Sequence, residues 1–292
     1  MYKLKDSKIN LDNMLKPTRN SAVDNKRFKT IIPITNDGMF KAIFGREENI
    51  KFPCKLLSYI VDISYEELLK KLRFTKNETG KTKISEKAYR NDLVVMVGDT
   101  TINIEMNNNS DQEIRDRNFE YLMRLRNDKK SKMYTPVIQI NINNFSYEDD
   151  EVVRRDYAVM SDDKVLLTNK IIVVDIYLPN IKKKSYNKDK LSEMERFLLI
   201  GIEEDRKKVL EYVGGDILMK NLEETIEEVS LDDDLYEAYD KEWALKDQAE
   251  RDGKEEHKRE MVSTMYNNGM SVEDISKYTN ISLEYIKEVI NN

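Results

Sequence analysis

The sequence is poor in the residues that form several common kinds of reactive site. It contains one cysteine, Cys54, and one histidine, His257, among 292 residues. A lone cysteine cannot form an internal disulfide, and the two residues together lack the parts of a Cys/His zinc site or a Ser-His-Asp triad. A metal ion in this protein is therefore expected to have oxygen ligands, which favours Mg²⁺ or Mn²⁺.

Long apolar runs are also missing. The longest ones, such as IIVVDIYL, are far shorter than the roughly 20 residues needed to cross a bilayer, and MYKLKDSKIN has no apolar secretion segment. We expect a soluble, cytoplasmic protein with no membrane partner. Apolar residues make up 39% and charged residues 36%, with only 9 glycines and 5 prolines, as in a charged globular protein. The net charge of -6 leaves nucleic-acid binding open, since that needs only a local positive face.

The order of patterns along the chain predicts an α/β domain over residues 31–230. Residues 1–30 are polar and basic without a sustained period, so we expect an extended arm. Two helices are predicted after Asn36, with Gly45 ending the first, then Thr/Val/Ile-rich strands and a helix within DQEIRDRNFEYLMRLRNDKK. Strands in TPVIQININNF and KIIVVDIYLP and helices from about Leu191 follow. This order implies a mixed central sheet flanked by helices.

Residues 231–292 are expected to form a helical extension. A strongly charged helical stretch leads into three predicted short helices, in which Gly269 is a C-cap and Ser271 and Ser282 are N-caps. The pattern is similar to a small helix-turn-helix unit. Its surface has both signs of charge (EDISK, EYIKE), so reading DNA and forming a homo-oligomer both stay open.

The segment DLVVMVGDTTINIEMN predicts a β-hairpin. Gly98-Asp99 is a Gly-first pair of the kind that a two-residue type II′ turn requires. This register pairs Val97 with Thr100 and, stepping outward, Asp92 with Glu105, whose Cβ atoms would lie about 5 Å apart. Directly opposed acids destabilise a sheet, so the pair needs a cation or a shared proton.

Alternation along the second strand places Asn107 on the same face as Glu105 and Asp92. Ile102, Ile104 and Met106 then project to the other face. A divalent metal held by the two acids can polarise a phosphodiester and lower the pKa of a bound water, as phosphodiester hydrolysis requires. The alternative is that Asp92 merely begins a strand and Glu105 faces solvent, and spacing alone leaves both readings open.

Four segments in order carry a resemblance to a known family. They are NDGMFKAIFG, NDL followed by INIEMN, IRDRNFEYLMRL, and TPVIQININNF. Over roughly residues 33–180 the chain resembles the PD-(D/E)XK nuclease family transposases, which are related to the recombination-promoting nucleases. The resemblance implies a restriction-endonuclease-like α/β core and an Mg²⁺- or Mn²⁺-dependent DNA endonuclease associated with recombination or mobile elements.

The resemblance also implies roles for four residues. Asp92 matches the motif aspartate, Glu105 the acid of the E-x-K element, and Asn107 its third member; Asp37 matches an N-terminal acidic position. Asp92 and Glu105 are thereby the implied metal ligands. The sequence departs from the family at Asn107, where lysine is typical and glutamine common. The departure matters because an amide has no positive charge with which to orient water or offset phosphate charge.

Other cations are candidates for that missing charge. Lys83 or Lys87 lies on the preceding segment, and Arg117 lies on the following helix. Arg117, Tyr121 and Arg124 are spaced to share one helix face that would contact phosphates, although Arg124 fits a solvated face equally well. Phe119, Leu122 and Leu125 are expected on a packed face. Without such a cation, the fold would serve as a catalytically degenerate DNA-binding or assembly module.

Overall fold

The computed structural model describes residues 31–75, 78–79, 89–90, 92–110, 113–127, 135–146 and 151–291. The predicted arm at residues 1–30, together with Lys83 and Lys87, lies outside this part. The chain divides into two compact units, with the boundary between Tyr236 and Glu237. Each unit is described by itself below.

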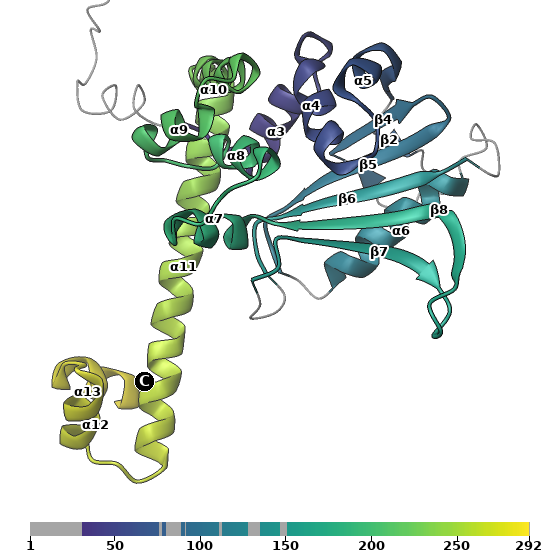
Figure 1. Ribbon diagram of the computed structural model, residues 1–292. Helices are drawn as coiled ribbons and strands as arrows, with labels where there is room; N and C mark the ends of the chain where they lie inside the picture. The colour runs from purple at the N-terminus through teal and green to yellow at the C-terminus, as the bar shows by residue number, and fades with distance from the viewer. Residues whose placement is uncertain are drawn as a thin grey trace, which may run out of the picture. The chain divides into compact units, whose positions relative to one another are not determined.

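A mixed six-stranded sheet forms the centre of the first unit, with the strand order β1-β4-β5-β6-β8-β7 (Figure 1). Its strands are β1 Leu72–Phe74, β4 Leu93–Val97, β5 Thr100–Asn107, β6 Val137–Asn143, β7 Arg154–Met160 and β8 Leu166–Tyr177. The β5–β6 and β6–β8 pairs are parallel, and the other three pairs are antiparallel. Two short strands, β2 Glu78–Thr79 and β3 Tyr89–Arg90, form a separate ladder. The predicted α/β core with a mixed sheet is therefore confirmed.

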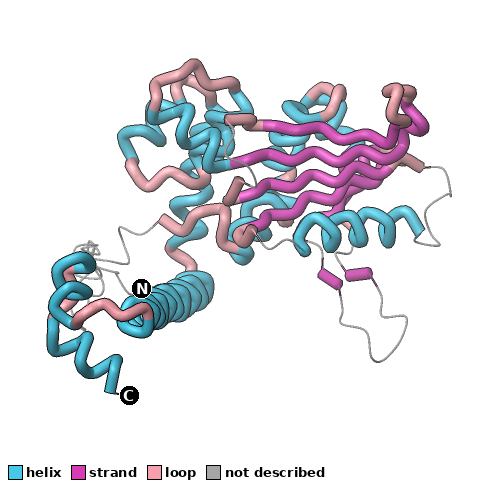
Figure 2. The backbone as a smooth tube through the Cα atoms, turned by 90° about the horizontal axis from the view of Figure 1, so that it is seen from below, coloured by secondary structure: helices cyan, strands magenta, loops and turns pink. Residues whose placement is uncertain are grey.

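Helices cover both faces of the sheet. The helices before and after the strands are α3 Asp37–Phe44, a 3₁₀ turn η1 Glu47–Asn49, α4 Lys51–Ile60, α5 Tyr65–Lys71, α7 Leu178–Tyr186, α8 Glu193–Ile200, α9 Arg206–Val213 and α10 Ile217–Ser230. The helix α6 Glu113–Asn127 lies along the opposite face from α4 and α5 (Figures 1 and 2). The helices after the last strand begin at Leu178 rather than near Leu191, because Pro179 in the first turn lets a helix follow β8 directly.

The first predicted helix ends as expected. The N–H of Gly45 donates to the carbonyl oxygen of Lys41 at 2.9 Å, and a Cβ at this position would lie 2.8 Å from that same oxygen. Phe40 and Phe44 are fully buried with ring centroids 5.0 Å apart. The short helix is thus anchored in the core, and its first turn is held in a fixed place beside the sheet.

The two faces of the sheet differ in chemistry although both are buried. Alternation along β5, β6 and β8 sends isoleucines and valines to one face, where helices cover them. The other face, under α6, is polar, and its buried members are Asn103, Glu105, Asn107, Gln139, Asn141, Asn143 and Asp175. Buried polar groups are costly unless they are hydrogen-bonded, so this face requires a connected network.

The second unit is entirely helical. The charged stretch and the first of the three predicted short helices form one helix of 35 residues, α11 Asp233–Asn267, which corrects the prediction of a separate short helix. Ion pairs one turn apart, such as Asp247–Arg251 at 2.8 Å, continue along it and favour an uninterrupted helix.

Two short helices complete this unit, α12 Val272–Thr279 and α13 Leu283–Asn291. Gly269 has a φ of 88° at the end of α11, and the hydroxyl of Ser271 accepts from the backbone N–H of Asp274 at 3.1 Å, as the caps predicted. Ser282 caps α13 in the same way. The apolar core of the unit is buried, with Val262, Ile275, Ile281 and Ile286 at its centre. No helix in the described part of the chain is both long and apolar enough to span a membrane.

Candidate active site

The β4–β5 hairpin has the predicted register. Val97 pairs with Thr100 and Leu93 with Ile104, and Gly98 has the positive φ, 61°, that the first position of a type II′ turn requires. One step further outward, the Asp92 carboxylate accepts from the backbone N–H of Met106 at 2.9 Å. The backbone N–H of Asp92 in turn donates to the carboxylate of Glu105. The two acids therefore lie across from each other at the open end of the hairpin.

Burial raises the pKa of both acids of the pair, and the charge of Asp92 raises that of Glu105 further. Burial, followed by the charge of Asp92, raises the pKa of Glu105 from its ordinary value of 4.5 to about 8, against a hydrogen bond from Asn103 and the charge of Arg117. Burial also raises the pKa of Asp92, while the Met106 N–H and the Lys41 ammonium act in the opposite direction. Such a pair binds either a proton or an added cation.

The first turn of α3 brings a third acid and an ammonium to the pair. The side chain of Asn36 accepts from the N–H of Met39 at 3.0 Å and begins the helix, so that Asp37 is its first residue. The Nζ of Lys41, one turn later, lies 2.6 Å from the Asp37 carboxylate and 3.7 Å from that of Asp92. The structure therefore brings Asp37 close to Asp92, and its role as a site residue stays a prediction. Lys41 was missed, although its four-residue spacing from Asp37 was a usable signal.

The segment before α3 is tied to the end of β5. The side-chain amide of Asn108 donates to the backbone oxygen of Thr35 at 2.6 Å. This contact spans 73 residues of sequence and holds the entry to α3 beside the strand that has Glu105. Residues that are distant in the sequence thereby meet at one end of the sheet.

Asn107 positions a guanidinium instead of supplying a charge itself. Its side-chain oxygen accepts from Nη2 of Arg117 at 3.2 Å, and its side-chain NH₂ donates to the Asn143 amide oxygen at 3.0 Å. Arg117 acts electrostatically on Glu105, lowering its pKa. The positive charge that an amide lacks is therefore provided next to the acid pair by α6.

The face of α6 differs from the predicted one in two respects. Tyr121 is buried, and the Arg117 guanidinium lies over its ring at 5.8 Å from the centroid. Leu122 and Leu125 are buried as predicted, but Phe119 is 51% exposed, so its assignment to the packed face was wrong. Arg124 pairs with Glu120 one turn back at 2.7 Å, as on a solvated face. Arg117 is thus the member of the predicted basic face that lies at the acid pair.

A chain of hydrogen bonds runs from Glu105 across three strands beneath α6. The side-chain NH₂ of Asn103 donates to both Glu105 and Gln139, at 2.9 Å each. Gln139 donates to Asn141 at 2.8 Å, and Asn141 donates to Asp175 at 2.7 Å. We had not anticipated this network, although alternating polar residues in INIEMN, IQININ and VDIY show it once the three strands are neighbours. Through the hydrogen bond from Asn103, this network orients the Glu105 carboxylate.

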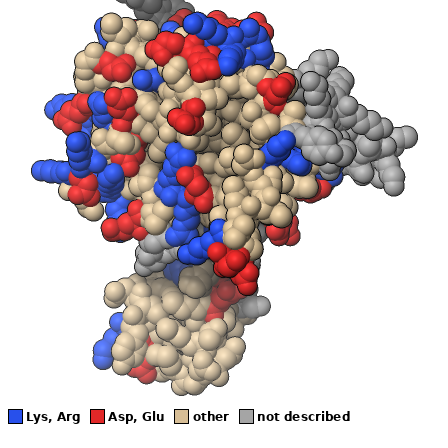
Figure 3. All heavy atoms as spheres, turned by 45° about the vertical axis from the view of Figure 1, so that its right-hand side comes forward, with Lys and Arg blue, Asp and Glu red and all other residues tan. Residues whose placement is uncertain are grey.

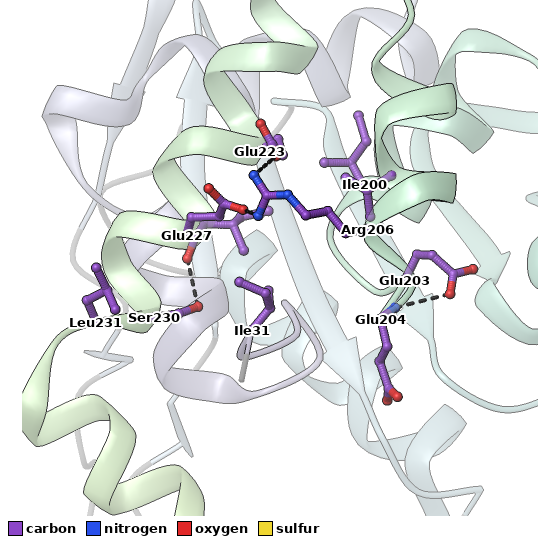
Figure 4. A pocket seen from close by; sticks show the side chains of 11 residues that line it. Ile31, Ile200, Glu203, Glu204, Arg206, Glu223, Glu227, Ser230 and Leu231 are labelled. Atoms are coloured by element: carbon purple, nitrogen blue, oxygen red, sulfur yellow. Dashed lines mark hydrogen bonds and ion pairs between the residues drawn. The ribbon is translucent and has the colours of Figure 1, made fainter. Parts of the chain in front are cut away.

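A cavity elsewhere in the first unit is lined by side chains that pair with one another. The cavity of about 370 Å³ among α8, α9 and α10 contains Arg206, which reaches Glu223 at 3.3 Å and also pairs with Glu227 (Figure 4). A hydrogen bond from the Ile32 N–H to the Ser230 hydroxyl at 3.0 Å closes one side. This cavity is therefore part of the packing of the three helices.

A comparison with known protein families shows which family the chain belongs to. The family model of the PD-(D/E)XK nuclease family transposases matches residues 34–256, well over half of the chain. The chain belongs to this family. No match was found among curated proteins or among solved structures. The family supports a nuclease-like function connected with mobile elements, and PD-(D/E)XK nucleases typically use divalent metals.

The carboxylate oxygens at the hairpin are of the kind that bind the divalent metals such nucleases use. Within the described ranges, no three His, Cys, Asp or Glu side chains are grouped as a ready metal cluster. Mg²⁺, however, is usually bound through one or two carboxylates, with waters and substrate phosphates completing its octahedron. Asp92 and Glu105 provide that number of carboxylates. Elsewhere, on the face seen in Figure 3, basic and acidic side chains are interspersed, so a site for DNA must rely on local charge.

Proposed function

We propose that this protein is a Mg²⁺-dependent DNA endonuclease that hydrolyses phosphodiester bonds, with Asp92 and Glu105 as the metal ligands. The observation that carries the proposal is the acid pair across the hairpin, in which Glu105 is buried and Asp92 half-buried and the pKa of both carboxyls is raised. When bound, Mg²⁺ or Mn²⁺ supplies a Lewis acid that polarises the phosphodiester and activates a water. The connection with mobile elements suggests that cutting promotes recombination, and we expect it to take place in the cytoplasm.

The flanking side chains of the chain itself have three tasks in this proposal. Arg117, held by Asn107 and supported by the ring of Tyr121, neutralises a phosphate of the bound strand. Lys41 occupies the edge of the pair beside Asp92 and, held by Asp37, offsets its charge until a metal binds. The amide chain below holds the Glu105 carboxylate in place.

Cleavage of supercoiled plasmid tests the proposal. Wild type is expected to nick DNA with Mg²⁺ or Mn²⁺ and not with EDTA. Asp92→Ala, Glu105→Ala and the isosteric Asp92→Asn and Glu105→Gln should abolish nicking while circular dichroism stays unchanged. Asp99→Ala is the matched control, because it removes an exposed acid from the turn of the same hairpin. Nicking that survives in Asp92→Ala would show that the acid pair is not the metal site.

A second candidate function follows from Asn107. Both polar atoms of this buried amide are engaged, by Arg117 and Asn143, so the position of the usual lysine has no catalytic ammonium. A domain of this kind could bind DNA without cutting it. Binding of labelled duplex by wild type, with no cleavage under any metal, would establish this second function and overturn the first.

We also propose that the chain is organised as an arm at 1–30, a nuclease-like domain at 31–230 and a helical extension at 231–292 that mediates homo-oligomer formation. The extension has its own apolar core, and its long helix has charges of both signs, which favours protein contact over DNA contact. Light scattering of the full chain and of a protein lacking residues 254–292 tests this. An unchanged mass together with weaker DNA binding would contradict the oligomer.

A further inference from the structure

A cavity lies beside the acid pair on the polar face of the sheet. Its volume is about 340 Å³, and α6, β6, β7 and β8 surround it. Its lining includes two aromatic side chains, Phe119 and Tyr157, and six polar or charged ones. Two of the six, Arg115 and Asp116, are exposed, and the other four are the buried Asn118, Gln139, Asn141 and Asp175. Gln139, Asn141 and Asp175 belong to the hydrogen-bond chain that ends at Glu105. Phe119 and Tyr157 have no role in the proposed nuclease site.

The cavity and Glu105 lie on neighbouring strands of the same face of the sheet. Asn141 is the register partner of Glu105 across the β5–β6 pair, and Asp175 is the partner of Asn141 across β6–β8. Adjacent strands lie about 4.8 Å apart, so the polar lining begins one strand away from Glu105 and ends roughly 10 Å from it. A single nucleotide spans that distance between its phosphate and its base.

The chemistry of the lining suits a flat heteroaromatic ring with a hydrogen-bonding edge. Phe119 and Tyr157 are 51% and 40% exposed, so their rings are available for stacking. Arg115 and Asp116 supply exposed polar groups at the cavity, while β7 and β8 add apolar wall. The buried amides and Asp175 hydrogen-bond to one another and hold the polar side of the cavity in a fixed arrangement. The charged members of the lining have both signs, since Arg115 lies there with Asp116 and Asp175, so the aromatic rings and the apolar wall favour a base over a phosphate.

We propose that this cavity binds one unpaired nucleobase of the DNA, next to the phosphate that is cut. The proposal rests on the proposed nuclease function, because the acid pair gives the cavity its neighbour. A base inside a duplex cannot reach a pocket of this kind without leaving the stack. The substrate class is therefore DNA that has an unpaired or easily unpaired nucleotide, such as a bulge, a mismatch or a single-stranded end.

Binding to matched DNA probes tests the pocket without relying on cleavage. The full chain with Asp92→Asn, which is expected not to cut, is titrated in Mg²⁺ against a labelled duplex and against the same duplex with one bulged nucleotide. Stacking of a base on an aromatic side chain is expected to make the bulged probe bind about tenfold more tightly. Adding Phe119→Ala or Tyr157→Ala should remove most of this ratio, and Phe119→Trp should keep it.

Tyr186→Ala is the matched control, because this tyrosine is 52% exposed and lies outside the cavity. Equal affinity for the two probes, or an unchanged ratio in Phe119→Ala with an intact fold, overturns the pocket. The two proposals fail separately: plasmid nicking by wild type with no bulge preference removes the pocket alone. A bulge preference that depends on Phe119 and Tyr157, without nicking, supports the pocket and removes the nuclease.

Discussion

Replacing Glu105 with glutamine is expected to stabilise the metal-free protein at neutral pH, although it removes a proposed metal ligand. The pKa of Glu105 is raised from 4.5 to about 8 by burial and by the charge of Asp92. Between these values the folded state keeps a proton that the unfolded state has released, so stability falls as the pH rises. The stabilising contribution is full below pH 4.5 and is lost as the pH rises through about 8.

The size of the effect follows from this interval. Each pH unit within it changes the free energy of unfolding by about 1.4 kcal/mol, so the change between pH 5 and pH 7.5 is about 3 kcal/mol. Glutamine keeps the shape and the oxygen that accepts from Asn103 but does not ionise. The stability of Glu105→Gln relative to wild type should therefore increase by about 3 kcal/mol over that range.

Urea denaturation followed by circular dichroism, in EDTA at four pH values from 5 to 7.5, measures this difference. Asp99→Asn, an exposed acid on the same hairpin, should stay parallel to wild type. Adding Mg²⁺ should stabilise wild type, more at higher pH, and leave Glu105→Gln unchanged. If wild type and Glu105→Gln keep a constant difference at every pH, Glu105 does not have a raised pKa and the reasoning is wrong.

The remaining predictions concern cleavage, the guanidinium, the buried network and the units. Nicking at limiting Mg²⁺ should accelerate up to about pH 8 and depend less on pH at saturating Mg²⁺, because metal and proton compete for Glu105; a flat profile at limiting Mg²⁺ contradicts this. Arg117→Ala should slow nicking by tenfold or more and reduce the salt dependence of DNA binding, whereas Asn107→Ala should slow nicking without changing the salt slope. Asn141→Leu should cost about 3 kcal/mol in urea denaturation, because it leaves several buried groups unpaired; a loss under about 1 kcal/mol would show that the network adds little. A protein that ends at Tyr236 should unfold cooperatively and retain the fold of the first unit, and a non-cooperative transition would contradict the division into units.

The hairpin could be predicted from the sequence because its determinants are local. Gly98-Asp99 specifies the turn, the turn specifies the register, and the register opposes Asp92 and Glu105. Asp37 was proposed as a site residue from the order of segments in the family, and the structure places it near Asp92. Neither the turn nor the spacing of α3 contains that information.

Other features depended on neighbours that a local pattern does not reveal. The polar residues of β5 and β6 read as a solvated face, and only the packing of α6 buries them. β7 was not predicted, because RRDYAVM lies at the sheet edge and is mostly exposed or half-buried, so its apolar alternation is weak. Phe119 was assigned to the core from helical spacing, while the cavity beside it leaves the ring exposed.

The hydrogen-bond chain beneath α6 has a direction. Glu105 accepts at one end and Asp175 accepts at the other, so at least one amide between them must donate both of its hydrogens along the chain. That amide is Asn103, and its oxygen is left buried with no hydrogen-bond partner among the described residues. The acceptor role of Asp175 in the cavity is thus linked through three amides to the atom that Glu105 meets, two strands away.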